Sequence, residues 1–431
     1  MSEAVADAEL TVAGVRSRVD ALVDTLRERA RETELEAVAD AELTVAGVRS
    51  RVDALVDTLR ERARETELQR GMLPENLADL TAAGVFKLTL PKDHGGLEAS
   101  ITEINEIVAQ ISRGDPSTGW MVAIITAMNT WVGFVADEAA EEILATPDLR
   151  ITGLIAPTGK AQPVDGGVQV SGVWMWNTAG KHSNWVALAC MCASEDPAKG
   201  PTPIACLVPT SSVTVHDTWD ASGMAGTATN KITAEDLFVP QSRVIPIPDL
   251  AAGTFVPRAK SDNPYYNRPA MNLFLGIQPA TMLGIARGAM DVFLERLPGR
   301  AITYTSYADA TQAPITHLQV AEAQYALEIA EMYTARIGAL IDGACELGIP
   351  VSLDERVRTR AYLAQVTRYS RECVTTLYHA SGASAIQNSV PIQRYFRDAH
   401  ALSLHALQQP TSAQELYGRH LLGLEPNTTL L

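Results

Sequence analysis

The periodicity of the chain changes twice, and these two changes limit the folds that it can adopt. Residues 151–244 form short alternating segments rich in Val, Thr and Trp, with turn signals such as the Asp-Gly-Gly at 165–167, and this pattern predicts a β domain. Helical spacing of apolar residues precedes this region from Asn76 and follows it from Met271. We therefore expect the order α, then β, then α along the chain.

An identical repeat occupies the N-terminus. Residues 3–35 and 36–68 match at all 33 positions, and each copy contains the pattern VxxVxxxV, which is typical of an amphipathic helix. Two copies are fewer than a repeat array needs to close a core, and 33 is not a multiple of seven, so the two apolar stripes do not align as one seam. Only the second copy runs directly into the following chain. We therefore treat residues 1–35 as a surplus copy and expect the second copy to pack.

The composition of the chain indicates which partners it does not favour and in which cellular compartment it works. The chain has 51 acidic and 35 basic residues, a net charge of −16, which argues against nucleic acid or an anionic membrane surface as a partner. Five scattered cysteines without zinc-type spacing indicate a reducing compartment, and the acidic N-terminus lacks the basic start of a signal peptide. The uncharged stretches Pro116–Ala136 and Pro269–Ala286 contain polar residues, so we expect buried helices there rather than membrane spans. These features predict a cytoplasmic protein.

Several familiar catalytic motifs are absent from the sequence. There is no G-x-G-x-x-G after a strand, no P-loop, no H-E-x-x-H and no G-x-S-x-G. The eight histidines include no pair at i and i+4, so we expect no metal site. All six tryptophans fall between residues 120 and 219, which favours an aromatic-lined pocket for a flat ligand between the first helical domain and the β domain. The ordinary use of tryptophan in a sheet core is the alternative.

One stretch of the β domain resembles a known flavoprotein motif. Residues 172–185, GVWMWNTAGKHSNW, resemble the flavin-side strand of the acyl-CoA dehydrogenase superfamily, where a Trp-x-Thr or Phe-x-Ser element packs beside the isoalloxazine ring. The later His182 and Trp185 resemble the group D flavin monooxygenases, whose form is roughly W-x-F-x-S-G-x-x-H-x-x-W. Further segments similar to the same family follow it in order, at Gly223–Thr227, Leu283–Ala289, Ser381–Ser384 and Pro391–Asp398.

The resemblance, which spans about Leu73 to Gly423, implies an acyl-CoA dehydrogenase-like α+β fold. It implies an N-terminal helical domain at 36–149, a central antiparallel β domain at 150–247, a loop or lid at 248–270 and a C-terminal four-helix bundle at 271–431. Relatives pair their bundles in a dimer of dimers with the flavin at a subunit boundary, which implies a homotetramer.

The end of the chain distinguishes two activities of this superfamily. Acyl-CoA dehydrogenases with this arrangement carry a carboxylate after R-D-A-R-x-x-x-I-[FY], and it removes the substrate α-proton. The sequence from Arg397 is RDAHALSLHA, so Ala406 stands at the carboxylate position and His405 lies beside it. Alanine cannot accept a proton, which argues against α,β-dehydrogenation, whereas a histidine near the flavin suits the group D hydroxylases.

The resemblance therefore implies the oxygenase component of a two-component flavin-dependent monooxygenase. Reduced FMN or FAD would come from a separate NAD(P)H:flavin reductase, because nothing in the chain resembles an NAD(P)H site, and O2 would be the cosubstrate. The reduced flavin and O2 would form a C4a-hydroperoxide, which needs the exclusion of water and a partner for flavin N5. The expected substrate is an aromatic or heteroaromatic small molecule of secondary metabolism.

The same resemblance assigns roles to individual residues. Thr178 is expected to contact flavin N5 and Trp176 to exclude water, whereas His405 would deprotonate the substrate, unless it is an ordinary helix histidine. His182 and Asn129 are further catalytic candidates, for which a strand-end cap and a purely structural hydrogen-bonding role are the alternatives. The remaining predicted flavin contacts are Thr158, Ser381, Gly382 and Arg300, the last being equally compatible with a surface ion pair.

Three other functions are compatible with the sequence. The first is N-oxygenation of an amino sugar or amine on the same fold, and the second is an acyl-CoA dehydrogenase or oxidase with its base on another helix. The third is a scaffold without catalytic activity. A dehydrogenase would purify yellow with oxidised FAD, whereas an oxygenase would purify colourless and consume reduced flavin, oxygen and substrate. Arg397 and Asp398 are interpreted as a structural ion pair.

Overall fold

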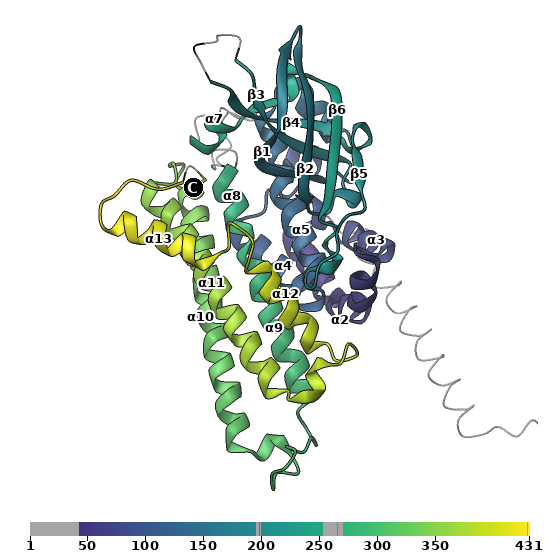
Figure 1. Cartoon of the computed structure of the whole chain (residues 1–431), viewed down its shortest axis with the longest axis vertical. Helices are drawn as coiled ribbons and strands as arrows, with labels where there is room; N and C mark the ends of the chain where they lie inside the picture. The colour runs from purple at the N-terminus through teal and green to yellow at the C-terminus, as the bar shows by residue number, and fades with distance from the viewer. Residues whose placement is uncertain (1–42, 195–197, 199, 253–264, 266–269, 429) are drawn as a thin grey trace, which may run out of the picture.

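The computed structural model describes residues 43–194, 198, 200–252, 265, 270–428 and 430–431. The surplus copy at 1–35 lies outside the described residues, as does most of the loop or lid predicted at 248–270. The described chain forms helices, then a sheet, then helices, as the two changes of periodicity predict (Figure 1).

The N-terminal helices pack around one apolar core. The first of them, within the second copy of the repeat, begins after Thr44, whose hydroxyl accepts a hydrogen bond from the Gly47 N–H, and it buries Val52, Leu55 and Leu59. This copy therefore packs from residue 45 onward. The helices of this domain are α2 (Val45–Gln69), α3 (Pro74–Ala82), α4 (Ile101–Gly114), α5 (Pro116–Asn129) and α6 (Asp137–Leu144).

Helix α5 explains the first uncharged stretch of the sequence. Every residue of α5 is buried, and it lies between the other helices and the sheet, where a charged side chain would lose its hydration. Of the helices in the described part of the chain, none combines the length and the apolar character needed to cross a membrane.

The central domain is a mixed sheet rather than the purely antiparallel one that the resemblance implied. Its strands are β1 (Ile151–Val164), β2 (Gly167–Asn177), β3 (Trp185–Cys192), β4 (Thr202–Pro209), β5 (Thr214–His216), β6 (Asn230–Pro240) and β7 (Val244–Pro246). They follow the order β5-β6-β2-β1-β3-β4-β7, in which β1 and β3 run parallel and the other neighbours antiparallel. The parallel pair arises because β2 carries the chain back along β1, so that β3 starts from the same end as β1.

The C-terminal helices extend away from the sheet as a bundle (Figure 1). Its long antiparallel pair is formed by α10, which has 33 residues and therefore spans about 50 Å, and α11. The connection between α9 and α10 lies at the end of the molecule opposite the sheet (Figure 1). Helix α7 (Ile247–Ala252) instead lies beside the sheet, in contact with β4 and β7. The helices that follow it are α8 (Ala270–Ile277), α9 (Pro279–Glu295), α10 (Pro314–Glu346), α11 (Leu353–Ala380), α12 (Ile392–Leu402) and α13 (Pro410–Leu421).

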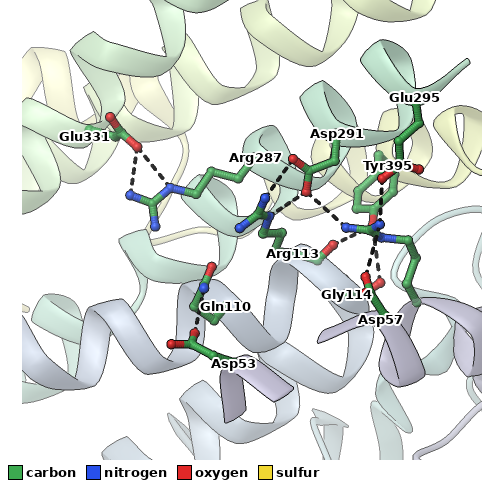
Figure 2. A network of polar contacts seen from close by, with 11 residues as sticks. Asp53, Asp57, Gln110, Arg113, Gly114, Arg287, Asp291, Glu295, Glu331 and Tyr395 are labelled. Carbon is green, nitrogen blue, oxygen red and sulfur yellow. Dashed lines mark hydrogen bonds and ion pairs between the residues drawn. The ribbon is translucent and has the colours of Figure 1, made fainter. Parts of the chain in front are cut away.

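Asp291 on α9 joins the N-terminal helices to the bundle (Figure 2). Its carboxylate accepts hydrogen bonds from Nε and Nη2 of Arg113 on α4, at 2.5 and 2.8 Å, and from Nη2 of Arg60 on α2, at 3.0 Å. The hydroxyl of Tyr395 on α12 donates to the Arg113 carbonyl at 2.6 Å. One cluster of polar contacts thus links α2, α4, α9 and α12.

Candidate active site

The end of β2 presents an aromatic side chain in an unusual backbone conformation. Trp176 has a φ of 65°, in the left-handed region that bulky residues rarely enter, and its side chain is 70% exposed. Such a conformation costs about 1–3 kcal/mol and is typical of functional sites. Val173 and Met175 on the same strand are also exposed, so this part of β2 offers an apolar surface to a ligand or a partner.

A bulge in the neighbouring strand lies beside this surface. The register between β1 and β3 shifts between Leu154 and Gly159, and the intervening Thr158 is exposed, with its hydroxyl donating to the Val173 carbonyl at 3.1 Å. Bulges re-aim side chains and are common next to active sites. Thr158 therefore lies beside the apolar surface of β2, because its hydroxyl is bonded to Val173.

Thr178 lies in the interior, two residues beyond Trp176. Its hydroxyl is 3.0 Å from the hydroxyl of Thr229, which is 2.6 Å from the hydroxyl of Thr227. The Thr227 hydroxyl in turn donates to the Met224 carbonyl at 2.9 Å. Thr178 is therefore one end of a row of buried hydroxyls. Thr229 was not predicted, and its only sequence signal is its place two residues after the motif that ends at Thr227.

His405 has the clearest features of a ligand-binding residue. Its ring packs edge-on against Trp120 of α5, with the ring centroids 5.3 Å apart. Burial, followed by the nearby Arg360 guanidinium, lowers the pKa of His405 to about 4, so the imidazole is neutral at pH 7. Its Nδ1 is buried and has no hydrogen-bond partner among the described residues. An orphaned polar atom of this kind calls for an explanation, and a bound ligand provides one.

Asn129 and His182 have structural partners instead. The Asn129 amide donates to the carbonyls of Phe86 and Leu149, at 3.0 and 3.1 Å, and its carbonyl accepts from the Ile151 N–H at 2.9 Å. These bonds tie the end of α5 to the start of β1. They favour the structural alternative for Asn129.

The imidazole of His182 accepts a hydrogen bond from the Met72 N–H at 3.0 Å through Nε2. Burial, with smaller contributions from Arg150 and Lys181, lowers the pKa of His182 to about 4, so the ring remains a neutral acceptor. It connects the loop after α2 to the turn before β3. A lone pair engaged in this way is not available to a substrate, and its partner is a loop N–H rather than the strand end that the capping alternative names.

The predicted phosphate contacts lie together at the end of α11. Arg300 donates through Nη2 to the Ser381 carbonyl and to the Ser384 hydroxyl, both at 3.0 Å. Gly382 has a φ of 66°, and a Cβ added there would meet nothing within 4 Å, so the backbone is open to a ligand. Arg300 belongs to the connection between α9 and α10, at the end of the molecule opposite the sheet (Figure 1). One chain therefore brings Arg300, Ser381 and Gly382 together, but not with Trp176 and Thr178.

The expected ion pair between Arg397 and Asp398 is absent from the described contacts. Arg397 pairs with Glu67 at 2.5 Å, and the fully buried Asp398 accepts a hydrogen bond from the Met224 N–H at 2.5 Å. Burial raises the pKa of Asp398 to about 7. A Cβ at Gly223 would lie 2.3 Å from the Arg397 carbonyl oxygen, so the turn before β6 approaches α12 more closely than any other residue type permits.

No group of His, Cys, Asp or Glu side chains within the described ranges has the arrangement of a metal site. None of the five cysteines, all of which lie within the described residues, forms a disulfide, and Cys190 and Cys206 are buried in the sheet.

The family models that match this chain describe acyl-CoA dehydrogenase domains, and proteins similar to it are hydroxylases. The family described as acyl-CoA dehydrogenase, N-terminal domain, matches residues 40–145, and the acyl-CoA dehydrogenase C-terminal domain matches residues 277–410. A pigment production hydroxylase from Rhodococcus sp. is 34% identical over 98% of this chain and 100% of its own length. The oxygenase component of a FADH2-dependent resorcinol hydroxylase from Rhizobium sp. is 30% identical over 81% of this chain and 88% of its own.

A solved structure has the same architecture. The crystal structure of 3-HSA hydroxylase from Rhodococcus sp. RHA1 superposes with a TM-score of 0.83 and 29% sequence identity, covering 89% of this chain and 99% of the other. The agreement extends over the helical domains and the sheet together.

Proposed function

The chain belongs to the acyl-CoA dehydrogenase family and, within it, to the oxygenase components of flavin-dependent monooxygenases, and on this basis we propose that it hydroxylates an aromatic or heteroaromatic small molecule. The reaction uses O2 and reduced FMN or FAD that a separate NAD(P)H:flavin reductase supplies. The similar oxygenase component of a resorcinol hydroxylase supports the aromatic class.

One observation carries this proposal more than any other. The position of the dehydrogenase carboxylate is occupied by Ala406, and the adjacent His405 offers a buried Nδ1 that no described residue satisfies. A neutral imidazole beside an indole face suits a phenolic substrate, because the ring of the substrate packs on Trp120 while its hydroxyl bonds to the imidazole. An acyl-CoA dehydrogenase with the usual arrangement would carry a carboxylate at position 406, which is alanine in this chain, so the dehydrogenase alternative needs its base on another helix.

The residues present fit a flavin. When bound and reduced, the flavin supplies the electrons that activate O2. Trp176 would cover its ring system and exclude water, and the Thr178 hydroxyl would hold the polar edge of the ring. Arg300 and the open backbone at Gly382 would bind phosphate.

We infer that the functional unit is a homotetramer with each flavin shared between subunits. Two observations support this assembly. The ring-binding and phosphate-binding residues do not meet within one chain, so a second copy has to complete each site. In addition, Leu318, Tyr325 and Met332 on α10 are each more than 60% exposed and recur every seven residues, which is the spacing of a helix-pairing seam. Light scattering tests the assembly, and a monomer at micromolar concentration would contradict it.

We place the enzyme in the cytoplasm, because an acidic chain whose five cysteines form no disulfide in the described part of the structure suits a reducing compartment. Secondary metabolism is the proposed setting of its substrate.

The decisive experiment measures colour, oxygen use and product together. The purified protein should be colourless, and with reduced flavin and O2 it should convert a member of a panel of phenols and indoles to a hydroxylated product. Omission of the reductase should abolish steady-state turnover, and pre-reduced flavin should restore one turnover. A yellow protein that bleaches with an acyl-CoA would refute the proposal, and N-oxidation of an amine in the same panel would replace the substrate class.

A further inference from the structure

Three threonine hydroxyls form a continuous chain that ends on a peptide carbonyl. Thr178, Thr229 and Thr227, which we call the threonine chain, are all buried, and their hydroxyls are 3.0 and 2.6 Å apart in that order. The last hydroxyl lies 2.9 Å from the Met224 carbonyl oxygen. The threonine chain connects the end of β2 to the start of β6, and these two strands are neighbours in the sheet.

The carbonyl at one end gives the threonine chain a direction. A carbonyl has no proton, so the Thr227 hydroxyl has to donate to Met224, and a hydroxyl has one proton to donate. With that proton engaged, Thr229 has to donate to Thr227, and Thr178 in turn has to donate to Thr229. The hydroxyl of Thr178 is thereby left with lone pairs alone to offer a ligand.

The Met224 carbonyl is held in place from several sides. It also accepts from the indole N–H of Trp219 at 2.9 Å, and the Met224 N–H donates to Asp398 on α12. Met224 itself has a φ of 52°, a conformation that persists only where its surroundings maintain it. The acceptor at the end of the threonine chain is therefore fixed before any ligand binds.

We propose that Thr227 and Thr229 are positioning residues that make Thr178 a hydrogen-bond acceptor and so select reduced over oxidised flavin. This inference rests on the proposed function and deepens it. The N5 atom of a reduced flavin carries a hydrogen that an acceptor can bind, whereas N5 of an oxidised flavin presents a lone pair that requires a donor. This preference suits an enzyme that receives reduced flavin from a reductase and has to release the oxidised flavin after turnover.

The test compares the dissociation constants of oxidised and reduced flavin, for FMN and for FAD, by anaerobic and aerobic fluorescence titration. Thr227→Val keeps the shape of the side chain but frees the proton of Thr229, which lets Thr178 act as a donor. The ratio of the oxidised to the reduced dissociation constant should then fall by about two- to tenfold, the range expected for one net hydrogen bond. Thr227→Ser retains the hydroxyl and should retain the wild-type ratio.

Two further variants distinguish an effect of the hydrogen-bond direction in the threonine chain from an effect of lost side-chain packing. Thr229→Val breaks the threonine chain at its centre and should lower the ratio in the same way. Thr334→Val removes a buried hydroxyl that donates within α10 and should leave the ratio unchanged. A loss of packing alone would raise the dissociation constants of oxidised and reduced flavin by the same factor, so their ratio would stay at the wild-type value.

The outcomes are distinguishable from a failure of the proposed function. If the wild-type protein binds no reduced flavin, the proposed function fails. If it binds reduced flavin, but folded Thr227→Val and Thr229→Val keep or increase the wild-type ratio, the direction assigned to the threonine chain is wrong.

Discussion

Substitution of Asp291 by alanine tests whether the contact in Figure 2 holds the N-terminal helices on the bundle. The side chain of Asp291 is 20% exposed, and it binds Arg60 and Arg113, which are 17% and 36% exposed. An exposed ion pair contributes about 0–1 kcal/mol, and breaking a fully buried one costs about 3–5 kcal/mol. Partial burial and two arginine partners place this loss between those limits, at about 2–3 kcal/mol.

The assay is thermal unfolding at fixed protein concentration and scan rate, without flavin. A loss of this size should lower the melting temperature by about 2–3 °C in a chain of this length, because the entropy of unfolding grows with chain length. The effect should persist in about 1 M salt, because partly buried pairs are screened much less than surface charges. The matched control is Glu331→Ala, which removes the carboxylate partner of Arg287 at a more exposed position in the same view and should cost less than about 1 kcal/mol. Equal losses for the two variants would refute the argument from burial.

Four further variants test two residues of the candidate site, the first repeat copy and the buried carboxylate of α12. His405→Asn should lower the single-turnover hydroxylation rate by about 10²–10⁴ with reduced-flavin binding nearly intact, and an unchanged rate would remove His405 from the mechanism. Thr178→Ala should divert oxygen into hydrogen peroxide, measured as the ratio of peroxide to product, and tight coupling would contradict its role. Deletion of Ser2–Leu35 should leave melting temperature and activity almost unchanged, whereas failure to fold would show that the first copy is structural. The pKa of Asp398 is about 7 in the folded protein, against an ordinary value of 3.8. Between pH 3.8 and pH 7 the native state therefore holds a proton that the unfolded state has lost, so the free energy of unfolding falls as pH rises. Asp398→Asn should therefore gain stability relative to wild type at pH 8 but not below pH 4, and parallel melting-temperature profiles against pH would refute this.

The order of the domains could be predicted because periodicity is local. Alternation marks strands and a spacing of three or four marks helices, so the α, β, α order and the packing of the second repeat copy followed from the residues alone. The parallel pairing of β1 with β3 could not be predicted, since it depends on which side of β1 the chain returns to after β2. Periodicity carries no information about that choice.

The roles of single polar residues were harder to predict for a related reason. Asn129 and His182 stand at motif positions, yet the structure gives their polar atoms to backbone groups such as Met72, which is 110 residues from His182 in the chain. The sequence does not predict a role for Thr229, because Thr229 meets Thr178 only through the pairing of β6 with β2. A hydrogen bond between distant segments leaves no trace in one sequence.

The close seam between the turn at 223–224 and α12 has a consequence for engineering. Gly223 has no room for a side chain against Arg397, and the Met224 N–H depends on the Asp398 carboxylate. A chimaera that took its β domain from one relative and its bundle from another would have to match both contacts at once. The smallest transplantable unit is therefore the turn at 223–227 together with α12, and exchanging either piece alone should misplace the hydroxyls that the turn supports.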